Sequence, residues 1–138
     1  MATYNKFQVF VQDKAHGVHN LSTGALKAAL TNTAPVATNT VLANLTEISY
    51  TNCSSRAITT SSSAHTTGTY KLTLADLTLT ASGGSVGPFR YVVVYNDTPA
   101  SPADPLIAWF DYGSSITLAD TETLLIDFDG TNGFLTEV

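Results

Sequence analysis

Residues 88–138 read PFRYVVVYNDTPASPADPLIAWFDYGSSITLADTETLLIDFDGTNGFLTEV, and the rest of the chain is organised around this stretch. It holds three runs rich in β-branched and aromatic residues, FRYVVVYN, LIAWFDYG and TLLIDFD, a composition that is favoured in strands. In the first run, Tyr91, Val93 and Tyr95 face one side and two valines face the other. A strand with two apolar faces is typical of the centre of a sandwich, or of a strand that another subunit covers.

Turn signals divide the rest of this stretch into short strands. The three prolines of NDTPASPADP cannot donate ladder hydrogen bonds, so this segment is a connector outside any central strand. Gly113 ends the second strand, and we expect a short strand at residues 116–118 and a turn at residues 119–121 to follow. A strand at residues 123–128, the turn GTNG and a terminal strand FLTEV complete the pattern.

The N-terminal part contains one expected strand and one ambiguous segment. Phe7, Val9 and Val11 alternate with polar residues, which predicts an opening strand with Phe10 on its opposite face. Residues 24–33 fit a helix, which alanines favour, and also a strand, because the leucines share one strand face. The shortness of the run and the threonines that follow favour the strand, although periodicity alone leaves both open.

The middle of the chain predicts short elements and one long loop. Asn44 or an earlier threonine could cap a single helical turn in VLANLTEIS. Residues 59–69 have nothing to bury and predict an exposed loop. In KLTLADLTLTA the leucines change parity, which predicts a bulge or tight turn near Ala75 and Asp76. About eight strands and at most one short helix predict an all-β fold, an antiparallel, jelly-roll-like β-sandwich that forms a single domain over residues 1–138.

Charge is scarce and unevenly distributed. Charged residues make up 12% of the chain, the net charge is −5, and no Lys or Arg follows Arg90. The acidic C-terminal part would repel phosphates, so we expect no nucleic acid partner, whereas a basic partner surface is compatible with it. A surface of hydroxyls and amides is easily buried, which favours a homo-oligomer, either a dimer or a trimer. The N-terminal residues match neither a secretory signal nor a membrane span, so we expect no membrane partner and synthesis in a cytoplasm.

Residue types that carry chemistry occur here without the spacing that chemistry needs. Cys53 is alone, so we interpret it as a buried or half-buried side chain. His16 and His19 do not complete a metal site, because no cysteine or carboxylate motif stands nearby. Residues 127–133 superficially resemble a calcium loop but lack the closing bidentate glutamate, so we interpret them as an Asx-type turn. No nucleophile elbow, P-loop or dinucleotide motif occurs, and we expect no enzyme activity, no metal and no cofactor.

Aromatic and valine side chains of the first two runs are the candidate binding residues. Large side chains on strands lie first of all in the core or at an interface between subunits. Alternatively, aromatics of the same runs, including Phe110, could line a sugar-binding groove. The candidate interface residues are Tyr91, Val93, Tyr95, Trp109 and Tyr112.

Three segments, FRYVVVYNDT, PLIAWFDYGSSIT and TLLIDFDGTNGFLT, resemble in order and spacing the small head-associated proteins of tailed bacteriophages. The N-terminal KFQVFVQD and ALKAALTNTAP are consistent with this resemblance, which covers most of the chain. The resemblance implies an oligomeric jelly roll or related β-sandwich that acts as a capsid decoration, or cement, protein. Such a protein binds the outside of the major capsid protein lattice and joins neighbouring capsomers.

The resemblance also implies a place for the protein. The protein would be made in the host cytoplasm and reside on the capsid exterior of the virion. The candidate interface residues come from the strand pattern and not from the resemblance, and they would contact a second subunit or the capsid. A function of a different class stays open, namely a tail or fibre adsorption module that binds a host glycan through exposed aromatics.

Overall fold

The computed structural model describes residues 2–138 and confirms the predicted all-β class, because the chain is 48% strand and 7% helix. In chain order the elements are β1 (Tyr4–Lys6), α1 (Val9–Ala15), β2 (Leu26–Thr31), the 3-10 helix η1 (Leu42–Asn44), β3 (Ala57–Ile58), β4 (Thr60–Thr66), β5 (Thr69–Leu74), β6 (Leu77–Thr80), β7 (Val86–Asn96), β8 (Leu106–Leu118), β9 (Thr123–Ile126) and β10 (Leu135–Glu137).

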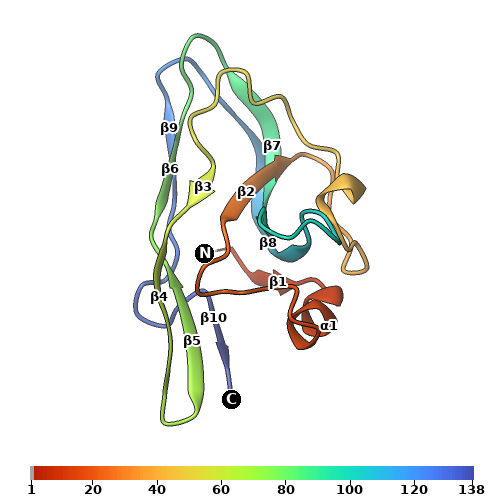
Figure 1. Cartoon of the computed structure of the whole chain (residues 1–138). Helices are drawn as coiled ribbons and strands as arrows, with labels where there is room; N and C mark the ends of the chain where they lie inside the picture. The colour runs from red at the N-terminus through yellow and green to blue at the C-terminus, as the bar shows by residue number, and fades with distance from the viewer. Residues whose placement is uncertain (1) are drawn as a thin grey trace.

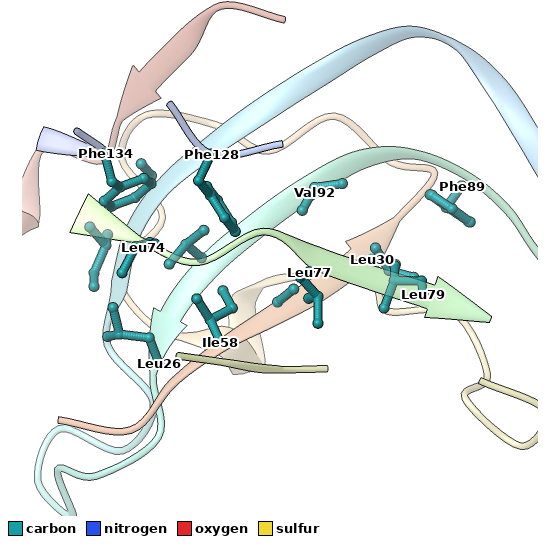
Figure 2. Close-up of a cluster of buried hydrophobic side chains, with 14 of the residues drawn as sticks. Leu26, Leu30, Ile58, Leu74, Leu77, Leu79, Phe89, Val92, Phe128 and Phe134 are labelled. Carbon is teal, nitrogen blue, oxygen red and sulfur yellow. The ribbon is translucent and has the colours of Figure 1, made fainter. Parts of the chain in front are cut away.

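The strands form three antiparallel sheets that pack in two layers (Figure 1). The first layer is a five-stranded sheet with the order β1-β8-β7-β2-β3. The second layer consists of a three-stranded sheet, β10-β5-β4, and a two-stranded sheet, β6-β9. Leu26, Leu30 and Val92 of the first layer share one buried cluster with Leu74 and Leu79 of the second (Figure 2). This face-to-face packing makes the fold sandwich-like, as the sequence predicts.

Strand β7 lies at the centre of the first layer and is buried on both faces. Phe89, Val92 and Val94 belong to the main core between the layers. Val93 and Tyr95 belong to a second, smaller cluster on the other face. That cluster also contains Phe7, Ala29 and Leu106, with Leu42, Leu45 and Trp109 packed against it. The predicted strand with two apolar faces is confirmed, and this chain itself covers both faces.

The ambiguous segment at residues 24–33 contains strand β2, the alternative that the sequence favoured. β2 pairs with β7 from Leu26 opposite Asn96 to Thr31 opposite Tyr91. Residues 28–31 are all buried, which a strand between two neighbours achieves by hiding both of its faces.

The predicted opening strand at Phe7, Val9 and Val11 is wrong, because this segment enters helix α1. Phe7 and Phe10 are buried, and their spacing of three residues suits one face of a helical turn. The N–H of Phe10 donates to the carbonyl of Phe7 over 3.2 Å. Val11, which a strand would bury beside Phe7, is 49% exposed. The two large aromatic side chains remove more area from water than the alternating valines would, and they set the local structure.

The predicted exposed loop at residues 59–69 is wrong in its backbone, because β4 runs through it. β4 pairs with β5 from Thr60 opposite Leu74 to Thr66 opposite Thr69, and the two strands form a long hairpin (Figure 1). Both turn residues, Thr67 and Gly68, have positive φ, as a two-residue hairpin turn of type I′ requires. Most of the side chains are exposed as predicted, with Thr60 and Ser63 half-buried, and the ladder to β5 makes the segment a strand.

Strand β8 continues through Gly113, where the sequence predicts an end. Gly113 has a φ of +102°, and its N–H donates to the Asp111 carboxylate over 2.8 Å. The register of the pairing with β7 shifts between Asp111 and Ile116. The glycine therefore makes an irregularity within one strand, and the separate strand predicted at residues 116–118 is the end of β8.

Two other predicted features, the helical turn near Asn44 and the break near Ala75 and Asp76, are confirmed. The Asn44 side-chain oxygen accepts the backbone N–H of Thr40 and that of Val41, just before the turn η1. Ala75 and Asp76 separate β5 from β6, which lie in different sheets. Within residues 2–138, no helix is long and apolar enough to cross a lipid bilayer.

Candidate functional site

An apolar groove lies between β8, in the first layer, and β9, in the second. Its volume is about 800 Å³. The turn between the two strands joins them, but no ladder pairs them, so they form separate walls. The lining residues are Ala2, Tyr4, Val92, Phe110, Tyr112, Leu124, Leu125, Ile126, Asp127, Phe128, Asp129, Gly130, Gly133 and Phe134.

Four aromatic rings pack against one another at this groove, and three of their four contacts are edge to face. The Tyr4 ring centroid lies 5.9 Å from that of Phe110 and 5.4 Å from that of Phe134. The Phe134 ring also meets Phe110 at 6.2 Å and Phe128 at 5.9 Å. Burial raises the pKa of Tyr4 to about 12, so its hydroxyl stays protonated at neutral pH. The aromatic cluster is therefore an uncharged, preformed surface.

The loop between β9 and β10 is held in place by its own hydrogen bonds. One Asp129 carboxylate oxygen accepts the backbone N–H of Thr131 over 2.9 Å and that of Asn132 over 2.8 Å. These bonds, with a third from the Asn132 amide, hold the pKa of Asp129 below its ordinary value. The Asx-type turn that the sequence predicts at residues 127–133 is confirmed.

The same loop brings two phenylalanines to the core. The N–H of Phe128 donates to Asp76 over 2.9 Å, and the N–H of Phe134 donates to the Leu72 carbonyl over 2.7 Å. Figure 2 shows both rings beside the other side chains of the main buried cluster. The loop therefore contributes Phe128 and Phe134 to the groove, and hydrogen bonds hold the backbone of both residues in place.

The charge of the groove is entirely negative. Its lining contains Asp127 and Asp129 and no Lys, Arg or His. The Asp127 side chain is exposed, and within residues 2–138 no hydrogen bond engages its carboxylate. Asp129 serves the turn, so Asp127 is the carboxylate that a bound partner could reach.

Strand β9 presents an edge to the groove as well as a face. Leu124, Leu125 and Ile126 all line it, although successive side chains of a strand point to opposite sides. β9 pairs with β6 alone among the described strands. Leu125 is 57% exposed, which is unusual for a leucine in the middle of a strand.

The predicted interface residues do not gather on one surface. Val93 and Tyr95 are buried, at 0% and 3% exposure, and lie in the smaller cluster. Trp109 is half-buried against the same cluster, where its ring lies 4.6 Å from that of Phe7.

The two remaining predicted residues lie on different sides of the sheet. Tyr91 is half-buried in β7, two residues from the buried Val93 on the same face. Tyr112 is 55% exposed and lines the groove with Phe110. Of the predicted set, Tyr112 alone is a groove residue.

The candidate residues predicted from the sequence do not include Leu125 or any other residue of β9. A usable signal was present, because the adjacent leucines of TLLI cannot both face the core of a strand. One of the two had to point outward.

The histidines and the cysteine occupy separate environments. His16 is exposed at the end of α1, whereas His19 is buried and burial lowers its pKa to about 4. Cys53 is half-buried, as predicted, and burial raises the pKa of its thiol. Across residues 2–138, no three side chains of His, Cys, Asp or Glu gather in a group that could hold a metal ion.

Comparison with known proteins identifies no relative that could explain the groove, so its interpretation rests on its geometry. No family model, no curated protein and no solved structure matches this chain. The groove lining, apart from Ala2 and Tyr4, comes from FRYVVVYNDT, PLIAWFDYGSSIT and TLLIDFDGTNGFLT.

Proposed function

We propose that this chain is a virion structural protein of a tailed bacteriophage, a capsid decoration protein that binds the outside of the major capsid lattice and stabilises the head. One observation carries the proposal. Residues from all three segments that resemble phage head-associated proteins line one groove, with Val92 from the first segment and the others from the second and third. A resemblance spread over unrelated surfaces would give no reason to connect it with a binding site.

The chemistry of the groove favours binding over reaction. Its surface consists of aromatic and aliphatic side chains with exposed members on both walls, Tyr112 from β8 and Leu125 from β9. Exposed apolar patches of this kind mark sites of interaction with other proteins. A cement protein needs such a surface on a stable module and needs no catalytic group, so we include the absence of enzyme activity in the proposal.

Self-association is a further part of the proposal. We expect a homo-oligomer, a dimer or a trimer, because low charge and abundant hydroxyls make surface burial inexpensive. Sedimentation of the purified chain at micromolar concentration should give a mass above that of one chain, 14.6 kDa. A mass of one chain over the whole concentration range would remove this part alone.

Purified particles test the proposal directly. Virions and DNA-free shells are separated by gradient, the chain is quantified by mass spectrometry, and an antibody against it is imaged by electron microscopy. We expect the chain in both kinds of particle and uniform labelling over the head. Its absence from both, or labelling confined to the tail together with binding on a glycan array, would reject decoration in favour of adsorption.

A further inference from the structure

The edge strands of the three sheets differ in how they are protected against pairing with another chain. β3 has only two residues, and the register of β4 is broken by an irregularity. β1 ends in Lys6, and β10 ends in Glu137. The outer side of β6 is covered, because Ser54 and Thr80 exchange hydrogen bonds of 3.0 and 2.9 Å. Short length, bulges, charge and coverage are the devices by which proteins prevent edge pairing.

Strand β9, with four residues, is longer than β1, β3 and β10, and it lacks the other devices. Its sequence, TLLI, contains no charge and no proline, and its register with β6 is unbroken. Because β6 is its partner on one side, alternate residues of β9 direct their N–H and C=O groups away from β6. Leu125 is exposed there, and Leu124 and Ile126 line the groove. An open edge therefore borders an apolar surface, which is the arrangement that accepts an added strand.

The negative charge around the groove determines which added segment would bind favourably. Asp127 directly follows β9, and its exposed carboxylate is the one lining charge that no hydrogen bond within residues 2–138 engages. A segment with a Lys or Arg at this point would gain attraction on approach and in the complex, and an acidic segment would be repelled.

A second copy of this chain does not supply such a segment, because five of its six Lys and Arg side chains already have partners within the chain. The pairs are Lys14 with Glu137, Lys27 with Asp97 and Arg90 with Asp111, and the carbonyls of Ala28 and Thr131 accept from Arg56 and Lys71. Lys6 is exposed, but it belongs to β1 and is paired with β8. The occupant that fits is therefore a different protein.

We propose that the groove between β8 and β9 binds an extended segment of a different protein, which adds a strand to the open edge of β9. Its alternate apolar side chains pack against Phe110 and Tyr112, and a Lys or Arg lies beside Asp127. The inference rests on the proposed function only for the source of that segment, the capsid shell.

The test uses a synthetic peptide of alternating valine and threonine that ends in lysines, added to the nitrogen-labelled full chain and followed by amide NMR shifts. We expect the shifts to concentrate at residues 123–127 and at Tyr112. Replacing the peptide lysines by glutamates should weaken binding about tenfold at low salt, because repulsion replaces attraction.

A matched pair of variants distinguishes peptide binding in the groove from peptide binding elsewhere on the surface. Leu125 and Val36 are both 57% exposed, so an arginine at either position should leave the fold intact. Leu125→Arg should abolish the peptide shifts, and Val36→Arg should leave them unchanged. No shifts at millimolar peptide, or shifts that survive Leu125→Arg, would overturn the inference. So would shifts that grow with protein concentration alone and vanish in Leu125→Arg, since a second copy would then fill the groove.

Co-sedimentation with DNA-free heads keeps this inference distinguishable from the proposed function. If the peptide binds in the groove but the chain does not bind to heads, the result contradicts decoration and supports the groove as a site for an extended segment. Binding to heads that Leu125→Arg leaves unchanged supports decoration and contradicts the groove as the docking site.

Discussion

The Nδ1 atom of His19 lies 3.2 Å from the Nδ2 atom of Asn96, and this contact fixes the protonation of a buried imidazole. The Asn96 side-chain oxygen accepts the N–H of Thr98 over 3.1 Å, so the amide turns its NH₂ end toward His19. Nδ1 therefore accepts, and the proton of the neutral ring is on Nε2, a buried atom without a hydrogen-bond partner in residues 2–138. Protonation of Nδ1 would place two donors face to face.

This contact predicts that stability falls in mild acid. Burial lowers the pKa of His19 from 6.5 to about 4 in the folded state, so its stabilisation is complete above pH 6.5 and is lost as the pH falls toward 4. The expected loss is about 1.4 kcal/mol per pH unit in that window, as linkage requires. Urea unfolding at a series of pH values measures it.

Two histidine variants serve as controls. The quantity compared is the slope of the free energy of unfolding against pH. His19→Asn keeps an acceptor for Asn96 and should remove the extra slope, although the lost ring contact with Phe10 lowers stability at every pH. His65→Asn, at an exposed position of β4, should keep the slope. Asp13, whose pKa burial raises, acts in the opposite direction and is common to all three proteins. Equal slopes in the wild type and His19→Asn would contradict the account.

Phe134 should be the residue of the groove that stability depends on most. It is 7% exposed and contacts the rings of Tyr4, Phe110 and Phe128. Phe134→Ala should lower the free energy of unfolding by about 3–5 kcal/mol, because the cavity adds to the lost burial. Val11→Ala, at a half-exposed site, should change it by less than about 0.5 kcal/mol. Similar losses in both variants would show that the aromatic cluster is not part of the core.

Gly68 is expected to determine the turn of the β4–β5 hairpin. Its φ is +82°, and a Cβ there would meet nothing within 4 Å, so only the backbone conformation resists a side chain. Gly68→Ala should destabilise the protein by about 1 kcal/mol. Gly130→Ala, also in open space but without positive φ, should be neutral or stabilise it slightly. A Gly68→Ala protein as stable as Gly130→Ala would refute the assignment of a type I′ turn.

The Asx turn at Asp129 should make the groove loop sensitive to strong acid. Hydrogen bonds from Asn132 and Thr131 hold the pKa of Asp129 below 3.8, so this stabilisation is present above that value and is lost as the pH falls further. Asp129→Ala should speed hydrogen exchange at the amides of Thr131 and Asn132 at neutral pH. Asp127→Ala, whose carboxylate accepts no such bond, should leave those rates unchanged. Unchanged rates in both variants would contradict the turn.

The strands that could be predicted are those whose side chains are buried by alternation or on both faces. β7 and β2 are examples, because their valines, alanines and leucines leave no other way to bury so many adjacent residues. The prediction failed where two periods fit the same residues. Phe7 and Phe10 suit a helical turn and Phe7 and Val9 suit a strand, and only the surrounding core decides between them.

The candidate site was harder to predict than the fold. Val93 and Tyr95 look the same in sequence whether another subunit covers them or the chain does, and here Leu42 and Leu45 help to cover them. The groove itself arises because β8 and β9, joined by a short turn, lie in different layers. Separation of that kind depends on the packing of whole sheets and leaves no local pattern.

A reconstruction by electron cryo-microscopy of the phage head that is proposed to carry this chain would decide whether the chain is a decoration protein. We predict density for the two-layered sandwich on the outer surface of the capsid lattice, with an extended capsid segment along the free edge of β9. Density for the chain only in the tail or fibres, only inside the shell, or nowhere on the particle would contradict the assignment as a decoration protein.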